Sequence, residues 1–250
     1  MFKKLILIIV FLLSAIYIYK NIKKVGENFT NYAPHYVFWT GGYDSTFRIC
    51  ELLVVHKVAV QPVYLDYNLD SANKTDFWVR KNRRQEYAAM NKVKNMLFER
   101  FPHTKNLLYN TIIIKQNTPY QKYDDAFNSL NLWPKKRKIH QYGHLGKVSF
   151  LMKTYIDIGV LGLHEKTPFV KFVRKNLEQE EYNNRLNINT QHPLHYLKFP
   201  LFDKTKKELC DISKQYNFND IIKSSWSCWF PKEGKPCGKC PMCRERFDCN

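Results

Sequence analysis

Four cysteines near the carboxyl end have the spacing of a metal site. Cys228, Cys237, Cys240 and Cys243 follow the pattern C-x8-C-x2-C-x2-C. Four thiolates from a compact loop can close a tetrahedron around zinc, with each sulfur about 2.3 Å from the metal. Disulfides or an iron–sulfur cluster are the alternatives. Because the segment is short and shows no open ligand position, the pattern favours a structural zinc site.

The other three cysteines do not extend this site. Zinc requires reduced thiolates, which is typical of a cytosolic setting. Cys50 and Cys210 fall within predicted helices, and we expect them to be ordinary buried thiols. Cys249 lies one residue from the end of the chain, and we expect no role for it.

A polar turn with two glycines is the second motif that could do chemistry. Gly41 and Gly42 allow a tight turn whose N–H groups can approach an anion. A helix that begins near Asp44 or Ser45 would direct its unpaired N–H groups to the same point. Hydroxyl groups add further donors: Thr40, Ser45 and Thr46. The turn therefore predicts a cradle for phosphate or pyrophosphate. A plain β–α turn, capped by Asp44 or Ser45, is the alternative.

Strand-like and helix-like patterns alternate along the chain. Strands are predicted over residues 36–39, 60–65, 111–114 and, more weakly, 160–163. Helices are predicted from residue 44 or 45 through 54, and over 83–101, 148–158 and 204–216. This alternation predicts an α/β fold with a mainly parallel sheet and helices on both faces. Ligands of such sheets bind at the carboxyl ends of the strands, where Asp66 and the glycine turn fall.

The first 29 residues differ from the rest of the chain. An apolar run extends from Leu5 to Tyr19 and is broken only by Ser14. As a helix it would rise about 22 Å, less than the roughly 30 Å of a hydrocarbon core, although flanking lysines can snorkel. The run favours an uncleaved single-pass membrane anchor, with a signal peptide or an interfacial helix as alternatives. By the positive-inside rule, the lysines on either side of the run slightly favour a main domain that faces the cytosol.

Composition limits the class of protein. The 250 residues hold 40 Lys and Arg against 22 Asp and Glu, and 44% are apolar, which excludes a wholly disordered chain. A multi-span transporter is excluded because only one apolar run is long enough to consider. The net charge of +18 favours anionic ligands such as nucleotides, nucleic acids or acidic lipids. We predict three parts: an amino-terminal segment (1–29), an α/β domain (30–220) and a zinc-binding tail (221–250).

The two motifs, taken in order, resemble a known enzyme family. The turn Thr40–Thr46, T-G-G-Y-D-S-T, is similar to the S-G-G-x-D-S-T loop of the PP-loop ATP pyrophosphatases. The segment 226–228 with 237–244 resembles the zinc tail of the 7-cyano-7-deazaguanine (preQ0) synthases of that superfamily. Weaker blocks lie between them in the same order: Leu65–Tyr67, Arg84–Glu86, and Phe199–Leu201 with Lys204.

The resemblance implies an ATP-dependent ligase with the PP-loop, adenine nucleotide alpha-hydrolase-like fold. Such enzymes adenylate the carboxylate of 7-carboxy-7-deazaguanine, release pyrophosphate and convert the acid with ammonia to an amide and then a nitrile. The implied cofactors are ATP, Mg²⁺ and Zn²⁺, and the implied assembly is a homodimer. The implied phosphate-loop residues are Thr40, Gly41, Gly42, Ser45 and Thr46. Asp44 would cap the loop or position Mg²⁺, and Lys204 would neutralise charge at the phosphorus. Asp66 and Tyr67 would border the nucleotide.

The chain departs from the family in the elements that recognise substrate. The P-G-R-N segment has no clear match near residues 141–144, and the Tyr-Pro-Asp-Cys-Arg motif is missing after residue 165. The acid that this chain accepts is therefore open. Two other readings stay open as well. One is a PP-loop enzyme that modifies tRNA, and the other is a non-catalytic, zinc-stabilised nucleotide-binding protein at a membrane.

Overall fold

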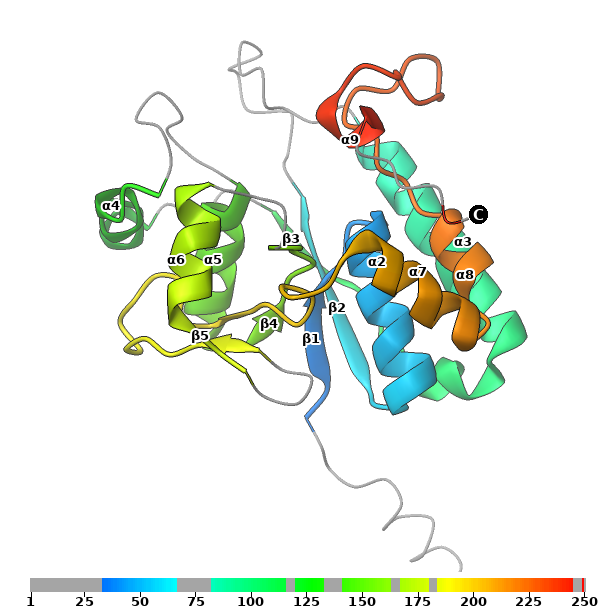
Figure 1. The fold of residues 1–250 in the computed structure, drawn as a ribbon, viewed down its shortest axis with the longest axis horizontal. Coiled ribbons are helices and arrows are strands. Elements are labelled where there is room, and N and C mark those ends of the chain that lie inside the picture. The colour runs from blue at the N-terminus through cyan, green and yellow to red at the C-terminus, as the bar shows by residue number, and fades with distance from the viewer. Residues whose placement is uncertain are drawn as a thin grey trace, which may run out of the picture. The chain divides into compact units, whose positions relative to one another are not determined.

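A mixed, mostly parallel sheet lies at the centre of the computed structural model (Figure 1). The structure describes residues 33–66, 82–115, 120–132, 141–162, 167–179, 184–244 and 249. Within these residues the strand order is β3-β2-β1-β4-β7-β6-β5. The strands are β1 (His35–Phe38), β2 (Val60–Asp66), β3 (Ile112–Lys115), β4 (Ile156–Asp157), β5 (Leu177–Glu178), β6 (Arg185–Leu186) and β7 (Leu197–Lys198).

The pairing of the strands confirms the predicted α/β class. Strands β3, β2, β1, β4 and β7 are parallel, whereas β6 and β5 add an antiparallel edge. Strand β1 lies in the middle of the sheet; β2 and β3 follow on one side, and β4 lies on the other side of β1. The strand order therefore reverses between β1 and β4, and ligands of open α/β sheets bind at such a reversal.

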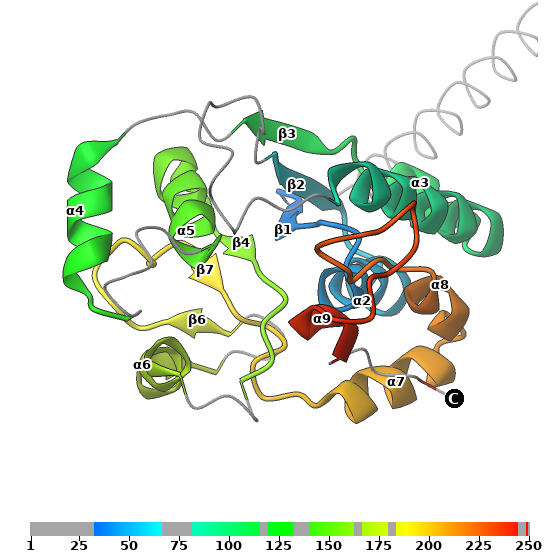
Figure 2. The ribbon, with the colours of Figure 1, turned by 90° about the horizontal axis from the view of Figure 1, so that it is seen from above.

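Helices cover both faces of the sheet, as predicted (Figures 1 and 2). One face carries α2 (Tyr43–Cys50), α3 (Arg83–Arg100), α7 (Lys206–Gln215) and α8 (Asn219–Lys223). The other carries α5 (Gln141–Met152) and α6 (Pro168–Asn176), with α4 (Gln121–Ser129) packed on α5. The remaining helical turns are η1 (Glu51–His56), η2 (Pro102–Asn106) and α9 (Pro241–Arg244).

Alternate side chains of β1 enter the two cores on either side of the sheet. Val37 and Trp39 pack with α2 and α8, whereas Phe38 packs with Ile156 and Phe169 on the opposite face. This follows from the two-residue period of a strand, which directs successive side chains to opposite faces. Because β1 is apolar on both faces, it is buried at the centre of the sheet.

The bounds of most predicted elements agree with the structure. The three main strands and the helices 83–101 and 204–216 lie within two residues of the observed bounds. The helix predicted over 148–158 is wrong, because α5 ends at Met152 and Ile156–Asp157 form β4. Residues 160–162 form no strand within the described part, and Leu163 lies outside it. A two-residue strand is too short to be separated from an adjacent helix by its periodicity.

The predicted location of the protein, anchored in a membrane with the main domain in the cytosol, is corrected by the structure. Among the residues described, no helix combines the length and the apolar character needed to cross a bilayer. Residues 5–19, from which the anchor was predicted, lie outside the described residues. An apolar run of fifteen residues is also about 8 Å shorter, as a helix, than the hydrocarbon core.

Candidate active site and metal centre

The glycine turn connects β1 to the amino terminus of α2 at the carboxyl edge of the sheet. Gly41 has a φ of +69°, in the left-handed region that favours glycine. A Cβ at this position would also lie 2.9 Å from the carbonyl oxygen of Glu86 in α3. Gly42 is the N-cap of α2 and no side chain caps the helix, so Asp44 and Ser45 both lie in its first turn. The turn is thus not the side-chain-capped β–α turn that was the alternative.

The backbone N–H groups of this turn are not engaged by the fold. Within the part of the chain described, none of the N–H groups of residues 40–45 donates a hydrogen bond. The first engaged amide of α2 is that of Thr46, which donates to the Gly42 oxygen at 2.9 Å. Trp39 Nε1 donates to Thr46 Oγ1 at 3.1 Å and helps to hold the turn in place. Six consecutive amides at the positive end of a helix make a site suited to an anion.

A lysine from α7 lies beside this turn. Lys206 Nζ donates to Asp44 Oδ1, and both side chains are about 29% exposed. The same Nζ lies 4.6 Å from the centre of the Tyr43 ring. Burial, with a smaller contribution from the Asp44 carboxylate, raises the pKa of Tyr43 to about 12. The turn therefore combines free amides, one cation and one carboxylate.

The lysine at Asp44 is Lys206, whereas the resemblance implied Lys204. Lys204 instead lines a cavity of about 290 Å³ under α2 with Arg48, His56 and other residues. Thr205 is the N-cap of α7 and forms a capping box with Glu208. Lys204 precedes this cap, whereas Lys206 stands in the first turn of the helix. The pattern Thr-x-x-Glu in the sequence is the signal that could have identified Lys206.

A buried ion-pair network holds α2 against the end of β4. Arg48 is 1% exposed, and its guanidinium donates to Asp157 Oδ2 at 2.8 Å and to Glu51 Oε2 at 2.7 Å. Burial alone would lower the pKa of Arg48, but the two carboxylates raise it above its ordinary value. Arg48 therefore stays charged and ties α2 to the sheet. This network was not predicted from the sequence.

Gly159, which follows β4, packs directly on the first turn of α2. A Cβ at this position would lie 2.9 Å from Asp44 Cβ and 2.9 Å from the Ser45 amide nitrogen. The two loops on either side of the strand-order reversal, after β1 and after β4, therefore meet at the candidate site. Gly159 was not predicted from the sequence, because no motif surrounds it.

Gly159→Ala is expected to displace the first turn of α2. Overpacking of this kind costs roughly 1–3 kcal/mol in the free energy of unfolding, which urea titration would measure. Gly42→Ala is the matched control, since its φ is −75° and its nearest contact would be 3.3 Å. Equal stability of the two variants would show that Gly159 does not support the turn.

Asp66 lies at the carboxyl end of β2, where it was predicted. Its side chain is 2% exposed, and Oδ2 lies 2.5 Å from Arg83 Nη2 in the first turn of α3. Its other oxygen, Oδ1, is buried and has no hydrogen-bond partner among the residues that the structure describes. One turn further along α3, the Glu86 carbonyl packs on Gly41, so α3 connects Asp66 to the glycine turn. Tyr67 lies outside the described residues.

The four cysteines predicted to bind metal come together. Their Sγ atoms all lie within 4.8 Å of one another, with Cys228 and Cys240 buried and Cys237 and Cys243 half-buried. A tetrahedral zinc site with sulfur 2.3 Å from the metal needs sulfur–sulfur distances of about 3.8 Å, which small side-chain movements would reach. The donor set therefore fits zinc. All four positions are occupied by protein ligands, which is typical of a structural site.

Backbone donors prepare one of these thiols for a metal. The N–H groups of Lys239 and Cys240 donate to Cys237 Sγ at 3.4 and 3.3 Å. These two hydrogen bonds lower the pKa of Cys237 to about 6. The thiolate, which is the form that binds zinc, is therefore favoured at neutral pH.

The zinc module, residues 226–244, is attached to the glycine turn by Trp226. The backbone N–H of Trp226 donates to the Gly41 oxygen at 2.8 Å. Its indole Nε1 donates to the oxygen of Cys228, the first metal ligand, at 2.7 Å. Trp226 thus connects the cysteine cluster with the glycine turn, although the two motifs are almost 200 positions apart in the sequence.

Two of the remaining cysteines form a disulfide, which corrects the sequence-based expectation for both. Cys210 in α7 and Cys249 at the carboxyl end are joined, with 5.6 Å between their Cα atoms. Cys50 is a free, fully buried thiol, as predicted. Spacing along the chain does not show which distant cysteines meet, because that depends on tertiary geometry.

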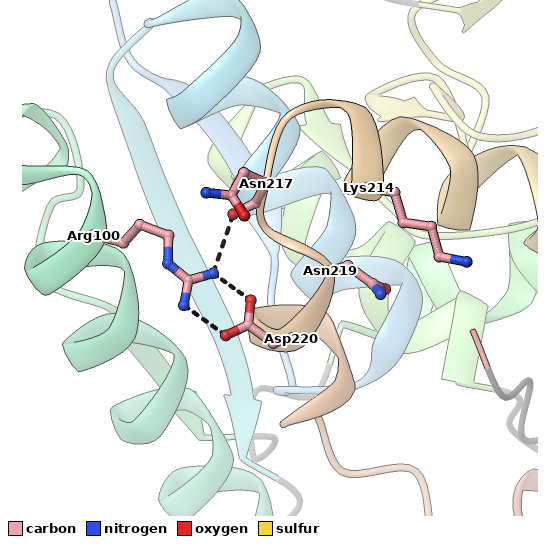
Figure 3. A pocket seen from close by; sticks show the side chains of 5 residues that line it. All are labelled: Arg100, Lys214, Asn217, Asn219 and Asp220. Atoms are coloured by element: carbon pink, nitrogen blue, oxygen red, sulfur yellow. Dashed lines mark hydrogen bonds and ion pairs between the residues drawn. The ribbon is translucent and has the colours of Figure 1, made fainter. Parts of the chain in front are cut away.

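A larger cavity, of about 540 Å³, lies away from this chemistry. It is bounded by the ends of α3, α7 and α8 (Figure 3). Arg100 donates to Asp220 with both terminal nitrogens and to the Asn217 oxygen at 3.1 Å. The hydrogen bonds between the two side chains raise the pKa of Arg100 and lower that of Asp220. This exposed ion pair joins α3 to α8.

Comparison with known proteins agrees with this geometry over part of the chain. Residues 168–249 match the family model described as queuosine biosynthesis protein QueC. No curated protein matches the chain. The matched segment includes Lys206 and the four cysteines, whereas the glycine turn lies outside it. The carboxyl-terminal third of the chain is therefore similar to QueC, and this similarity supports a protein of the QueC-like PP-loop type.

Proposed function

We propose that the chain is an ATP-dependent ligase of the 7-cyano-7-deazaguanine synthase type. The observation that carries the proposal is the set of six unengaged amides at residues 40–45, next to the cation of Lys206. The match to QueC over residues 168–249, a segment that does not include the glycine turn, supports the same class.

The proposed reaction needs a site that stabilises a leaving pyrophosphate. A carboxylate is a poor electrophile, and its coupling to AMP supplies a good leaving group. The amides of residues 40–45 would hold the oxygens of the pyrophosphate as its negative charge develops. Lys206 would neutralise part of that charge, and Asp44 would orient Lys206. Fixed donors at a helix terminus need little reorganisation during the reaction, which is why they are effective in catalysis.

Two metals are implied by this proposal. Mg²⁺ prefers oxygen ligands, and the Asp44 carboxylate offers such a ligand at the turn. When bound, Mg²⁺ would neutralise phosphate charge. Zn²⁺ would be held by the four cysteines and would stabilise the zinc module. Because Trp226 connects this module to Gly41, we propose that zinc acts on the reaction only through the position of the turn.

The substrate proposed is 7-carboxy-7-deazaguanine or a related heterocyclic acid, with ammonia as the nitrogen donor. The test incubates the full chain, loaded with zinc, with MgATP, ammonium and this acid. Pyrophosphate release and product masses are then measured. We expect release that depends on the acid, and products with the masses of the amide and the nitrile. Nucleotide binding without turnover of any acid in a broad panel would overturn the proposal and favour a non-catalytic nucleotide-binding protein.

A further inference from the structure

A tight hairpin of the zinc module places two lysines directly opposite each other. Lys232 and Lys235 exchange both of their backbone hydrogen bonds, at 3.0 and 2.8 Å. The two residues between them, Glu233 and Gly234, have φ angles of +48° and +78°, as in a type I′ turn. Residues paired in this way direct their side chains to the same face, with Cα atoms about 5.5 Å apart. The hairpin therefore presents two like charges side by side.

This arrangement of charge is unfavourable for the chain by itself. Like charges directly opposite each other in a ladder destabilise the pairing of the two strands. Pro231 and Pro236 flank the hairpin, and their rings restrict the backbone on either side of the lysine pair. An anion bound between the two ammonium groups would offset their repulsion. The hairpin is therefore a stiff segment suited to an anionic partner.

No carboxylate neutralises this charge among the residues that the structure describes. The charged residues of the zinc module are four basic and one acidic, and all are exposed: Lys232, Glu233, Lys235, Lys239 and Arg244. None of these side chains forms an ion pair in the described part of the chain, and Arg244 Nε donates to the Lys239 backbone oxygen at 3.2 Å. The hydrogen bonds to Cys228 and Cys237 Sγ come from backbone N–H groups. The lysine side chains are thus not needed to hold the thiols.

The hairpin is accessible to a large partner. A Cβ added at Gly234 or at Gly238 would meet no atom within 4 Å. Figures 1 and 2 show α9 and the loop before it on the side of the sheet that carries α2 and α3. The basic side chains of the module therefore project from the surface of the molecule into solvent.

Aromatic rings accompany the positive charge. Trp229 and Phe230 directly precede the hairpin and are half-buried, with ring centroids 6.5 Å apart and planes at 87°. Basic side chains beside aromatic rings are the combination that binds single-stranded nucleic acids, because cations follow the phosphates and bases stack on the rings. A lipid surface is less suited, since residues 226–244 contain no Val, Leu or Ile that could enter it. The chemistry of the module therefore favours a nucleic acid.

We propose that the zinc module is a docking surface for single-stranded nucleic acid. Its phosphates are bound by Lys232, Lys235, Lys239 and Arg244, and a base stacks on Trp229. Four phosphate contacts give the logarithm of the affinity a slope of about −2.8 against the logarithm of the salt concentration. A change from about 50 to about 200 mM salt then weakens binding roughly 50-fold.

The test follows the fluorescence anisotropy of a labelled single-stranded RNA of about 15 nucleotides as the full, zinc-loaded chain is added. Neither ATP nor an acid substrate is present, so the outcome is separate from that of the proposed ligase reaction. The titration is repeated between about 50 and 200 mM salt, and we expect the slope given above. No measurable binding at the lowest salt concentration would overturn the proposal.

Two pairs of substitutions locate the binding surface. Lys232→Gln combined with Lys235→Gln removes two phosphate contacts, so the slope should fall to about −1.4 and the Kd should rise roughly 25-fold at about 0.1 M salt. The matched control is Lys171→Gln combined with Lys175→Gln, which removes two exposed lysines of α6 on the opposite face of the sheet. The control pair should change neither quantity. An equal loss for both pairs would overturn the proposal, because binding would then follow the overall charge alone.

Charge-preserving substitutions and an altered ligand test the chemistry. Lys232→Arg combined with Lys235→Arg should bind like the wild type, and a loss as large as that of the glutamine pair would overturn the role of charge. An abasic strand of the same length keeps the phosphates but cannot stack, so it should bind at least about fivefold more weakly at the same slope. Equal affinity for the abasic strand would overturn the assignment to nucleic acid. Tighter binding to phosphatidylserine–phosphatidylcholine vesicles or to polyglutamate than to the RNA would overturn it as well.

Discussion

Lys206→Ala is expected to lower ATP-dependent pyrophosphate release by roughly 100-fold or more, whereas Lys204→Ala should change it by less than about twofold. Removal of one fixed group that stabilises developing charge typically costs 10²–10³ in rate. Lys206 lies at Asp44 beside the free amides of the glycine turn, and Lys204 lines a different cavity. The two lysines are only two positions apart, so Lys204→Ala is a closely matched control.

Stability should distinguish this catalytic effect from a structural one. The Lys206–Asp44 pair is about 29% exposed on each side, and ion pairs of this kind contribute about 0–1 kcal/mol to folding. We therefore expect Lys206→Ala to keep nearly the wild-type midpoint in urea. The kinetic measurement is steady-state pyrophosphate release with the acid varied. A larger loss for Lys204→Ala than for Lys206→Ala would contradict the assignment and restore Lys204 as the charge-neutralising residue.

Cys240→Ser is expected to abolish stoichiometric zinc binding and to lower the free energy of unfolding by roughly 4 kcal/mol. Cys240 is 5% exposed and lies within 4.8 Å of the other three ligand atoms. The zinc module has little regular structure apart from α9, so metal binding supplies much of its folding energy. Its loss would also release Trp226 from Gly41, and nucleotide affinity should then fall.

Lys239→Ser is the matched control for this variant. Lys239 is the exposed neighbour of Cys240 and uses its backbone, not its side chain, to contact Cys237. We expect Lys239→Ser to retain about one zinc per chain and the wild-type stability. Zinc content by atomic spectroscopy and unfolding in urea, with and without a chelator, are the measurements. If Cys240→Ser kept one zinc and full stability, the cluster would not be a structural metal site.

Features set by neighbouring residues could be predicted from the sequence. Strands β1, β2 and β3 and helix α3 are recognisable as apolar or amphipathic patterns, and their bounds agree with the structure closely. The four cysteines fall within a short loop, so their approach to one another follows from the length of chain between them. Gly41 takes the left-handed conformation that a tight turn into a helix requires.

The remaining features depend on which elements pack together. Lys206, Gly159 and the Cys210–Cys249 pair are each brought to their partners by segments that lie far apart in the chain. No spacing rule covers such contacts, because the energy that selects them comes from burial of the whole core. The residue types and spacing along the chain thus determined that the protein has a cysteine cluster suited to a metal and a glycine turn suited to an anion. Tertiary packing decided which lysine serves the glycine turn, because Lys206 and Asp44 lie 162 positions apart and meet only where α7 packs beside α2.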